Sequence, residues 1–265
     1  NGSPFPVSLQ SRGAELLASQ PTLAVAGTPA QWSNFRVLET HEDFVVLGGS
    51  GQLPGIELTW RGELWFDGLY QLDWTLTPAD GSAPVRDLTL SWSIPKQYGR
   101  YFLCRNYPYV SVPWRNNEIS QPLNIQDAQW LTGTEKGMLW LPLTSANWVA
   151  GEKPATRLRR QNDLIAVELN LIAKPVQLKS PAQYSLALMG TPARRPPENF
   201  RTFNMGGYLA TQYGNTQIFG TAGFRDPLRE DDIRGLTGHL LRDPDAFRRT
   251  WYAQYASKGV RLFPY

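Results

Sequence analysis

The sequence predicts a mainly β protein, an antiparallel β-sandwich followed by a short stretch of α/β character. Three observations predict this fold class. Apolar and polar residues alternate over three segments within residues 55–94, further short alternating runs continue to residue 190, and the pattern changes after a proline-rich stretch at residues 191–197. Successive side chains of a strand point to opposite faces, so each alternating segment has one apolar face that a second layer must cover.

Residues 55–94 predict three antiparallel strands that are joined as a meander. Their apolar positions are Ile56, Leu58, Trp60, Leu64 and Phe66 in the first, Tyr70, Leu72, Trp74 and Leu76 in the second, and Leu88, Leu90, Trp92 and Ile94 in the third. Asp67-Gly68 separates the first two strands and is a strong hairpin signal. Asp80-Gly81 lies in the proline-bounded link to the third strand. We expect the tryptophans of the apolar face to lie in the core and Trp65 to lie on the opposite face.

Shorter runs on both sides of the meander predict further strands. Before it, the strand candidates are residues 5–10, 22–26, 34–39 and 43–48, with turns at Arg12-Gly13 and residues 48–51. After it, we expect a hairpin at residues 130–143, a strand pair at 158–161 and 164–172 with its turn at Asn162-Asp163, and a strand at 184–188. Residues 98–127 are rich in Asn, Pro and aromatics but lack periodicity, so they predict a long surface excursion.

The proline-rich stretch marks a domain boundary, because proline cannot continue a sheet. The predicted division is residues 1–197 as the β-sandwich domain and residues 198–265 as the start of an α/β domain that is incomplete. Within the second part, Asp243-Pro244 is a helix N-cap and first-turn pair. Aromatic residues then recur every four positions, on one face of a helix. They are Phe247, Trp251 and Tyr255, and Gly259 and a buried strand at residues 260–263 follow them.

The composition excludes several function classes. The formal net charge is +3, from 26 basic and 23 acidic residues, which is too balanced for a nucleic-acid partner. No apolar run approaches the roughly 20 residues that span a bilayer, so we expect no membrane partner. Apart from His41-Glu42-Asp43, which we interpret as a solvated turn, His41 and His239 lack neighbours at metal-ligand spacing. The glycines follow no phosphate-loop pattern, so we expect no metal and no cofactor. Cys104 is the single cysteine, which excludes an intrachain disulfide and leaves the compartment open.

The aromatic residues carry the remaining functional signal. Sugar rings stack on aromatic planes, because their C–H groups form an apolar face. The chain has 10 Trp, and several fall outside the predicted core. The candidates for carbohydrate binding are Trp65, Trp114, Trp130 and Trp148.

Three pieces of the sequence together resemble a known family. They are residues 62–69 with the Pro78 turn and the strand at 88–94, the hairpin at 130–140, and residues 184–192, Tyr-Ser-Leu-Ala-Leu-Met-Gly-Thr-Pro. They resemble the N-terminal β-sandwich of glycoside hydrolase family 123-like proteins. The resemblance implies that a (β/α)8 barrel follows the sandwich, so that residues 198–265 begin this TIM barrel. It also implies exo-β-N-acetylgalactosaminidase activity, in bacterial-type polysaccharide degradation by a secreted or periplasmic protein.

The resemblance supplies no catalytic residue for this chain. In the family, an Asp–Glu pair on later barrel strands positions the substrate's acetamido group and donates the proton, and no stretch here matches that pair. The leading hypothesis is therefore a non-catalytic sandwich that supports a carbohydrate-active barrel and has an amino-sugar glycan as its ligand. The alternatives are a stand-alone carbohydrate-binding module and a structural domain without a ligand. Residues 200–265 are expected to mediate self-association or to receive the remainder of a barrel.

Overall fold

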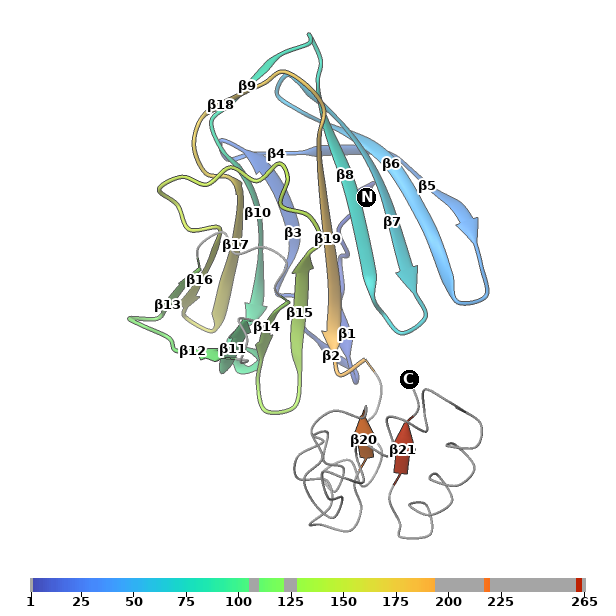
Figure 1. Ribbon diagram of the computed structural model, residues 1–265, viewed down its shortest axis with the longest axis vertical. Helices are drawn as coiled ribbons and strands as arrows, with labels where there is room; N and C mark the ends of the chain where they lie inside the picture. Colours follow the sequence, from blue (N-terminus) through green and yellow to red (C-terminus); the bar gives the residue numbers. More distant parts are fainter. Residues whose placement is uncertain (1, 105–109, 122–127, 194–216, 220–260, 264–265) are drawn as a thin grey trace, which may run out of the picture. The chain divides into compact units, whose positions relative to one another are not determined.

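The computed structural model describes residues 2–104, 110–121, 128–193, 217–219 and 261–263. The chain divides into two compact units, Asn1–Arg195 and Pro196–Tyr265, which we describe separately. The first unit contains two large antiparallel sheets that face each other (Figure 1). The two sheets enclose one hydrophobic core.

The larger sheet has nine strands in the order β12-β11-β14-β15-β19-β8-β7-β6-β5. Their bounds, in the same order, are Val110–Val112, Tyr101–Cys104, Gln129–Thr132, Gly137–Pro142, Ala182–Thr191, Tyr70–Pro78, Ile56–Trp65, Phe44–Leu53 and Gln31–Thr40. Every neighbouring pair in this sheet is antiparallel.

The smaller sheet has six strands in the order β13-β16-β17-β10-β3-β4. Their bounds are Glu118–Gln121, Thr156–Gln161, Leu164–Ile172, Leu88–Pro95, Ser19–Val25 and Thr28–Pro29. Two short pairs complete the unit, β1 (Gln10–Ser11) with β2 (Ala14–Glu15) and β9 (Ala83–Val85) with β18 (Val176–Leu178), and one 3-10 turn, η1 (Lys96–Tyr98), follows β10.

The core lies between the sheets, where alternate side chains of both interdigitate. Trp92 of the six-stranded sheet meets Trp140 of the nine-stranded sheet edge to face, with ring centroids 5.3 Å apart. Phe102 stacks on Trp140 within the larger sheet. Trp60 and Trp74 are 5% and 3% exposed, as the alternation predicts. These contacts confirm the predicted β-sandwich.

The predicted three-stranded meander is wrong in its third strand. The first two segments pair as β7 and β8, but the third, β10, lies in the six-stranded sheet between β17 and β3. The chain crosses between sheets through residues 79–87, where β9 pairs with β18 instead of closing a tight turn. Facing sheets pack about 10 Å apart, which a link of this length spans. Either arrangement buries the same apolar face of β10, so alternation could not separate them.

The predicted turn at residues 48–51 is also wrong, because these residues lie inside β6. Their glycines allow close packing between strands. A Cβ on Gly49 would lie 2.7 Å from Trp60 Nε1, and a Cβ on Gly51 would lie 2.7 Å from the Gln31 carbonyl oxygen. Glycine inside a strand often marks such an approach. The predicted turn at Arg12-Gly13 is confirmed, with both residues at positive φ between β1 and β2.

The remaining predictions fall into three groups. The hairpin β14–β15, the pair β16–β17 and the strand β19 are confirmed. The predicted surface excursion at residues 98–127 instead contributes β11 and β12 to the larger sheet and β13 to the smaller one. Of the predicted strand at residues 5–10, only Gln10 lies in a strand. Phe5 is buried, and its ring packs edge to face on Trp74.

In the second unit, β20 (Gln217–Phe219) and β21 (Arg261–Phe263) pair in parallel. The helix predicted around Phe247–Tyr255 lies outside the described residues, and so the barrel interpretation remains a prediction. The described part of the chain contains no helix with the length and hydrophobicity that crossing a bilayer requires.

Candidate ligand-binding face

The outer face of the nine-stranded sheet carries a row of polar side chains across three adjacent strands. We call it the polar face, and it comprises Thr59, Arg61 and Glu63 on β7, Gln71, Asp73 and Thr75 on β8, and Gln183 and Ser185 on β19. The register places Arg61 opposite Asp73 and Asp73 opposite Ser185. These side chains point away from the core because they alternate with its buried apolar residues.

A pocket of about 600 Å³ lies on the polar face. Its other wall is the segment after β15, including Leu143 and Asn147. Three hydrogen bonds fix this wall to β19: Asn147 Nδ2 donates to the Gln183 carbonyl (2.8 Å), the Leu143 amide donates to the Ser185 carbonyl (3.0 Å), and the Tyr184 hydroxyl donates to the Asn147 carbonyl (2.9 Å). The pocket is therefore formed between a sheet and a loop whose backbone is held in place.

Asp73 is the central acceptor of the pocket. The Ser185 hydroxyl donates to its Oδ1, and Gln71 Nε2 lies 3.4 Å from its Oδ2. A carboxylate offers about four acceptor positions. About half of the acceptor capacity of Asp73 therefore remains open to the pocket.

A cluster of charged and polar side chains extends the polar face toward β5. Arg61 pairs with Glu63 and lies 3.5 Å from Glu39, and His41 Nε2 lies 3.0 Å from the other Glu39 oxygen. The hydrogen bond from His41, followed by the charge of Arg61, lowers the pKa of Glu39 below its usual value. Hydrogen bonding to Glu63 raises the pKa of Arg61. Glu39 and Arg61 therefore stay ionised at neutral pH.

An aromatic stack lies at the end of the same face. It consists of His41, Phe44 and Trp65, with ring centroids 4.2 Å apart for His41–Phe44 and 4.7 Å apart for Phe44–Trp65. Phe44 and Trp65 are register partners, and Trp65 follows Arg61 and Glu63 at period two along β7. Trp65 therefore lies on the outer face, as the sequence predicts, and it is half-buried.

Trp130 lies on the other side of the polar face. It pairs with Leu139, which pairs with Met189, and all three alternate with buried residues of their strands. Its Nε1 donates to Thr191 Oγ1 (2.8 Å), which holds the half-buried ring on the outer face. Four strand steps separate β7 from β14, about 19 Å at the usual strand spacing. Two of the predicted tryptophans thus lie on the same outer face as the polar residues, at one end of the strands, and neither lines the pocket.

The other two predicted tryptophans lie elsewhere. Trp148 is 9% exposed and belongs to the core, although the loop that carries it lines the pocket. The Trp114 ring lies 3.8 Å beneath the Arg160 guanidinium, and its Nε1 donates to the Arg100 carbonyl (3.3 Å). Neither ring lies beside the polar face, so we leave both out of the candidate site.

The sequence did not single out the polar residues of the site. Asp73 and Ser185 are 112 positions apart, and only the pairing of β8 with β19 brings them together. The available signal was that each strand has polar residues at alternate positions, which also describes an ordinary solvated face. Among the described residues, no group of three His, Cys, Asp or Glu side chains could hold a metal ion.

No protein-family model matches the chain, and no curated protein matches it either. Solved structures with a similar fold include heparan sulfate lyase HepC from Pedobacter heparinus, with a TM-score of 0.38 and 10% identity over 66% of this chain and 25% of that one. A galactose mutarotase related enzyme from Lactobacillus acidophilus has a TM-score of 0.41 and 7% identity over 69% of this chain and 89% of that one. An amine oxidase from Aspergillus nidulans has a TM-score of 0.38 and 9% identity over 69% of this chain and 39% of that one.

These comparisons give a distant resemblance in fold. Two of the three proteins act on carbohydrates according to their names, and the third is an oxidase. The chain spans about a quarter of the length of the heparan sulfate lyase. TM-scores below 0.5 at such low identity carry no argument about a ligand, and the resemblance to glycoside hydrolase family 123-like proteins remains a prediction.

Proposed function

We propose that the sandwich binds carbohydrate on its polar face, as the non-catalytic part of a carbohydrate-active protein. The observation that carries this proposal is the pocket over Asp73 and Ser185, on an outer face that also carries Trp65 and Trp130. The proposal joins the geometry of the face to the family resemblance of the sequence.

The chemistry of the face suits a sugar. Sugar hydroxyls are both donors and acceptors, and Asp73 and Gln71 offer acceptors and amide donors within one pocket. The apolar face of a pyranose ring packs on an aromatic plane, which Trp65 at the end of the aromatic stack provides. The pocket volume of about 600 Å³ falls in the usual range for small-ligand sites.

The finer part of the proposal follows from the resemblance alone. The ligand would be a glycan that contains N-acetylhexosamine, and a barrel that begins within residues 198–265 would carry the catalytic carboxylates. A stand-alone carbohydrate-binding module would use the same face. A scaffold without a ligand would leave the face free of any saccharide.

Calorimetric titration of the full chain with N-acetylgalactosamine and with chitotriose tests the proposal. We expect saturable binding of at least one of them. The Asp73→Ala variant should bind about 10- to 100-fold more weakly, because a hydrogen bond to a charged group contributes about 1.5–3 kcal/mol. The Trp65→Ala variant should bind several-fold more weakly.

Two variants provide matched controls. Asp80→Ala removes an exposed carboxylate in the link after β8, and Phe35→Ala removes a half-exposed ring that packs near Trp60. Both should bind like the unaltered chain. Absence of saturable binding by either sugar, or equal affinity of the Asp73→Ala and Asp80→Ala variants, contradicts the proposal.

A further inference from the structure

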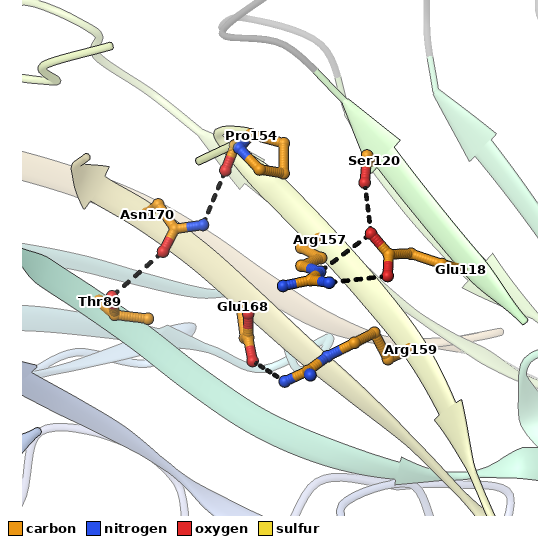
Figure 2. A network of polar contacts seen from close by, with 8 residues as sticks. All are labelled: Thr89, Glu118, Ser120, Pro154, Arg157, Arg159, Glu168 and Asn170. Carbon is orange, nitrogen blue, oxygen red and sulfur yellow. Dashed lines mark hydrogen bonds and ion pairs between the residues drawn. The ribbon is translucent and has the colours of Figure 1, made fainter. Parts of the chain in front are cut away.

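A second polar surface lies on the outer face of the six-stranded sheet, away from the face discussed above. Figure 2 shows its network, which links side chains of β10, β13, β16 and β17. Two hollows of about 290 Å³ and about 480 Å³ open on this surface and share Lys153, Pro154 and Asn170. We call this surface the arginine face, after Arg157 and Arg159 of β16.

The floor of the arginine face is fixed by a buried amide. Asn170 is 4% exposed; its Nδ2 donates to the Pro154 carbonyl (2.7 Å), and its Oδ1 accepts from the Thr89 hydroxyl (3.2 Å). The backbone N–H of Asn170 donates to the Ala155 carbonyl (2.8 Å). Through these bonds Asn170 holds the segment at residues 150–155 against the sheet.

Both arginines are held in place by carboxylates on neighbouring strands. Arg157 donates to Glu118 through Nε (2.9 Å) and Nη2 (2.8 Å), and the Ser120 hydroxyl donates to the same carboxylate (2.8 Å). Arg159 donates to Glu168 through Nη2. The Glu118 contacts raise the pKa of Arg157, so that it stays charged. The two guanidinium groups are therefore oriented before any ligand arrives.

Several N–H donors on this surface have no partner among the described residues. A guanidinium has five N–H donors, and each arginine uses only one or two of them in bonds to described residues. Arg159 Nε is buried and has no partner among the described residues. Lys153 adds an ammonium group, which is 3.1 Å from Asp87. Both oxygens of Glu118 already accept bonds, and Glu168, which lines the smaller hollow, accepts one from Arg159.

We infer that the arginine face is an oxyanion site, which takes a sulfate or carboxylate group between Arg157, Arg159 and Lys153. A planar guanidinium fork can donate two parallel hydrogen bonds to two oxygens of a carboxylate or of a tetrahedral sulfate. The smaller hollow brings all three cations to one place. This inference does not depend on carbohydrate binding at the polar face, because the two sites lie on different sheets.

The balance of charge predicts how the site binds. Glu118, Glu168 and Asp87 offset the three cations, so the surface has little net field to attract anions from a distance. Affinity would come from short hydrogen bonds in the hollow, and selectivity for an oxyanion over chloride would follow, because a spherical ion cannot satisfy several directed donors at once.

NMR of the arginine side-chain Nε–Hε groups tests the inference on the full chain. Sodium sulfate and sodium glucuronate are titrated separately against sodium chloride at constant ionic strength. We expect the Arg157 and Arg159 signals to shift saturably with at least one of the two anions and not with chloride. Sulfate alone indicates a sulfate site, and glucuronate alone indicates a carboxylate on a sugar.

Variants make the test specific. Arg159→Met should weaken anion binding at least tenfold. Arg159→Lys keeps the charge but loses the planar guanidinium, so it should retain part of the anion affinity. This second variant also keeps the test valid if Arg159→Met does not fold. Arg86→Met, at an exposed arginine outside both hollows, should bind like the unaltered chain. The inference is overturned if neither anion gives a saturable shift, if chloride gives the same shift, or if Arg86→Met weakens anion binding as much as Arg159→Met does.

Discussion

At the scale of single residues, two buried tyrosine hydroxyls hold backbone carbonyls in the sandwich by hydrogen bonds. Tyr184 is 1% exposed, stacks on Trp74 with ring centroids 5.6 Å apart, and donates its hydroxyl to the Asn147 carbonyl. Tyr70 is 6% exposed and donates to the Pro4 carbonyl (2.7 Å). Burial raises the pKa of both hydroxyls well above their ordinary value. Tyr184 therefore connects the core to the wall of the pocket.

The raised pKa values predict an alkaline loss of stability. The folded state holds the two phenolic protons more tightly than the unfolded chain, so their contribution is fully present below about pH 10 and declines as the pH rises beyond it. Tyr184→Phe removes one of the two groups. This variant should lose about 1 kcal/mol at pH 7, for one hydrogen bond, and should then lose stability less steeply between pH 10 and 11.

Urea unfolding at a series of pH values measures both effects. Tyr101→Phe, at a tyrosine that is 40% exposed, is the control and should follow the unaltered chain throughout. Parallel curves for the Tyr184→Phe variant and the unaltered chain above pH 10 would show that the buried hydroxyl does not set the alkaline limit.

At the scale of elements, the glycines of β6 show how a strand can look like a turn. Gly48, Gly49 and Gly51 leave room for side chains and backbone of β5 and β7, which approach β6 closely. A cluster of glycines usually indicates a flexible turn, but in β6 it indicates tight packing between strands. Gly49 is the clearest case, because an added Cβ would also lie 3.0 Å from the Ser33 carbonyl oxygen.

We therefore expect Gly49→Ala to destabilise the sandwich, although alanine is usually the better residue in an ordered element. Overpacking of this kind costs about 1–3 kcal/mol. Gln52→Ala, at an exposed position of the same strand, should change the free energy of unfolding by less than about 0.5 kcal/mol. Thermal or urea unfolding of the two variants checks the difference, and a neutral or stabilising Gly49→Ala would mean that β6 has room for the methyl group.

Sequence patterns located several of the strands but not their partners. Alternation identified β7, β8, β10 and β17 and the side of β7 that carries Trp65, because period two depends only on local geometry. It could not assign β10 to a sheet, since both sheets bury the same side of it. It also could not predict the contact of Asp73 with Ser185. That contact forms only because β8 pairs with β19, which lies more than a hundred residues later in the chain. Trp148 also looked like a loop residue, and only the packed structure shows that its ring is buried.

At the scale of the whole molecule, residues 1–195 form a unit with its own core and its own two sheets. We expect a chain that ends at Arg195 to fold cooperatively and to be at least as soluble as the full chain, because every described core residue of the sandwich lies between Phe5 and Leu188. Size-exclusion chromatography and a single urea transition would report this.

A shorter truncation provides the contrast. A chain that ends at Gln161 lacks β17 and β19, which lie inside the two sheets rather than at their edges, so it should fail to fold. If the chain ending at Arg195 also aggregates or unfolds without a transition, the sandwich needs the second unit and the predicted boundary is misplaced.

Because β19 is central in the sheet but late in the chain, the sheet cannot be completed until most of the first unit has been synthesised. β8 is finished at Pro78, yet the strand that pairs with its free edge begins only at Ala182. At about 5–20 residues per second, the ribosome needs roughly 5–20 s to make the chain between them. During that interval the β5–β8 segment has an unpaired edge and an incompletely covered apolar face, the features that make nascent β-sheets prone to aggregate. Chaperone protection should therefore matter most for the first half of the chain, while the last central strand is still being made.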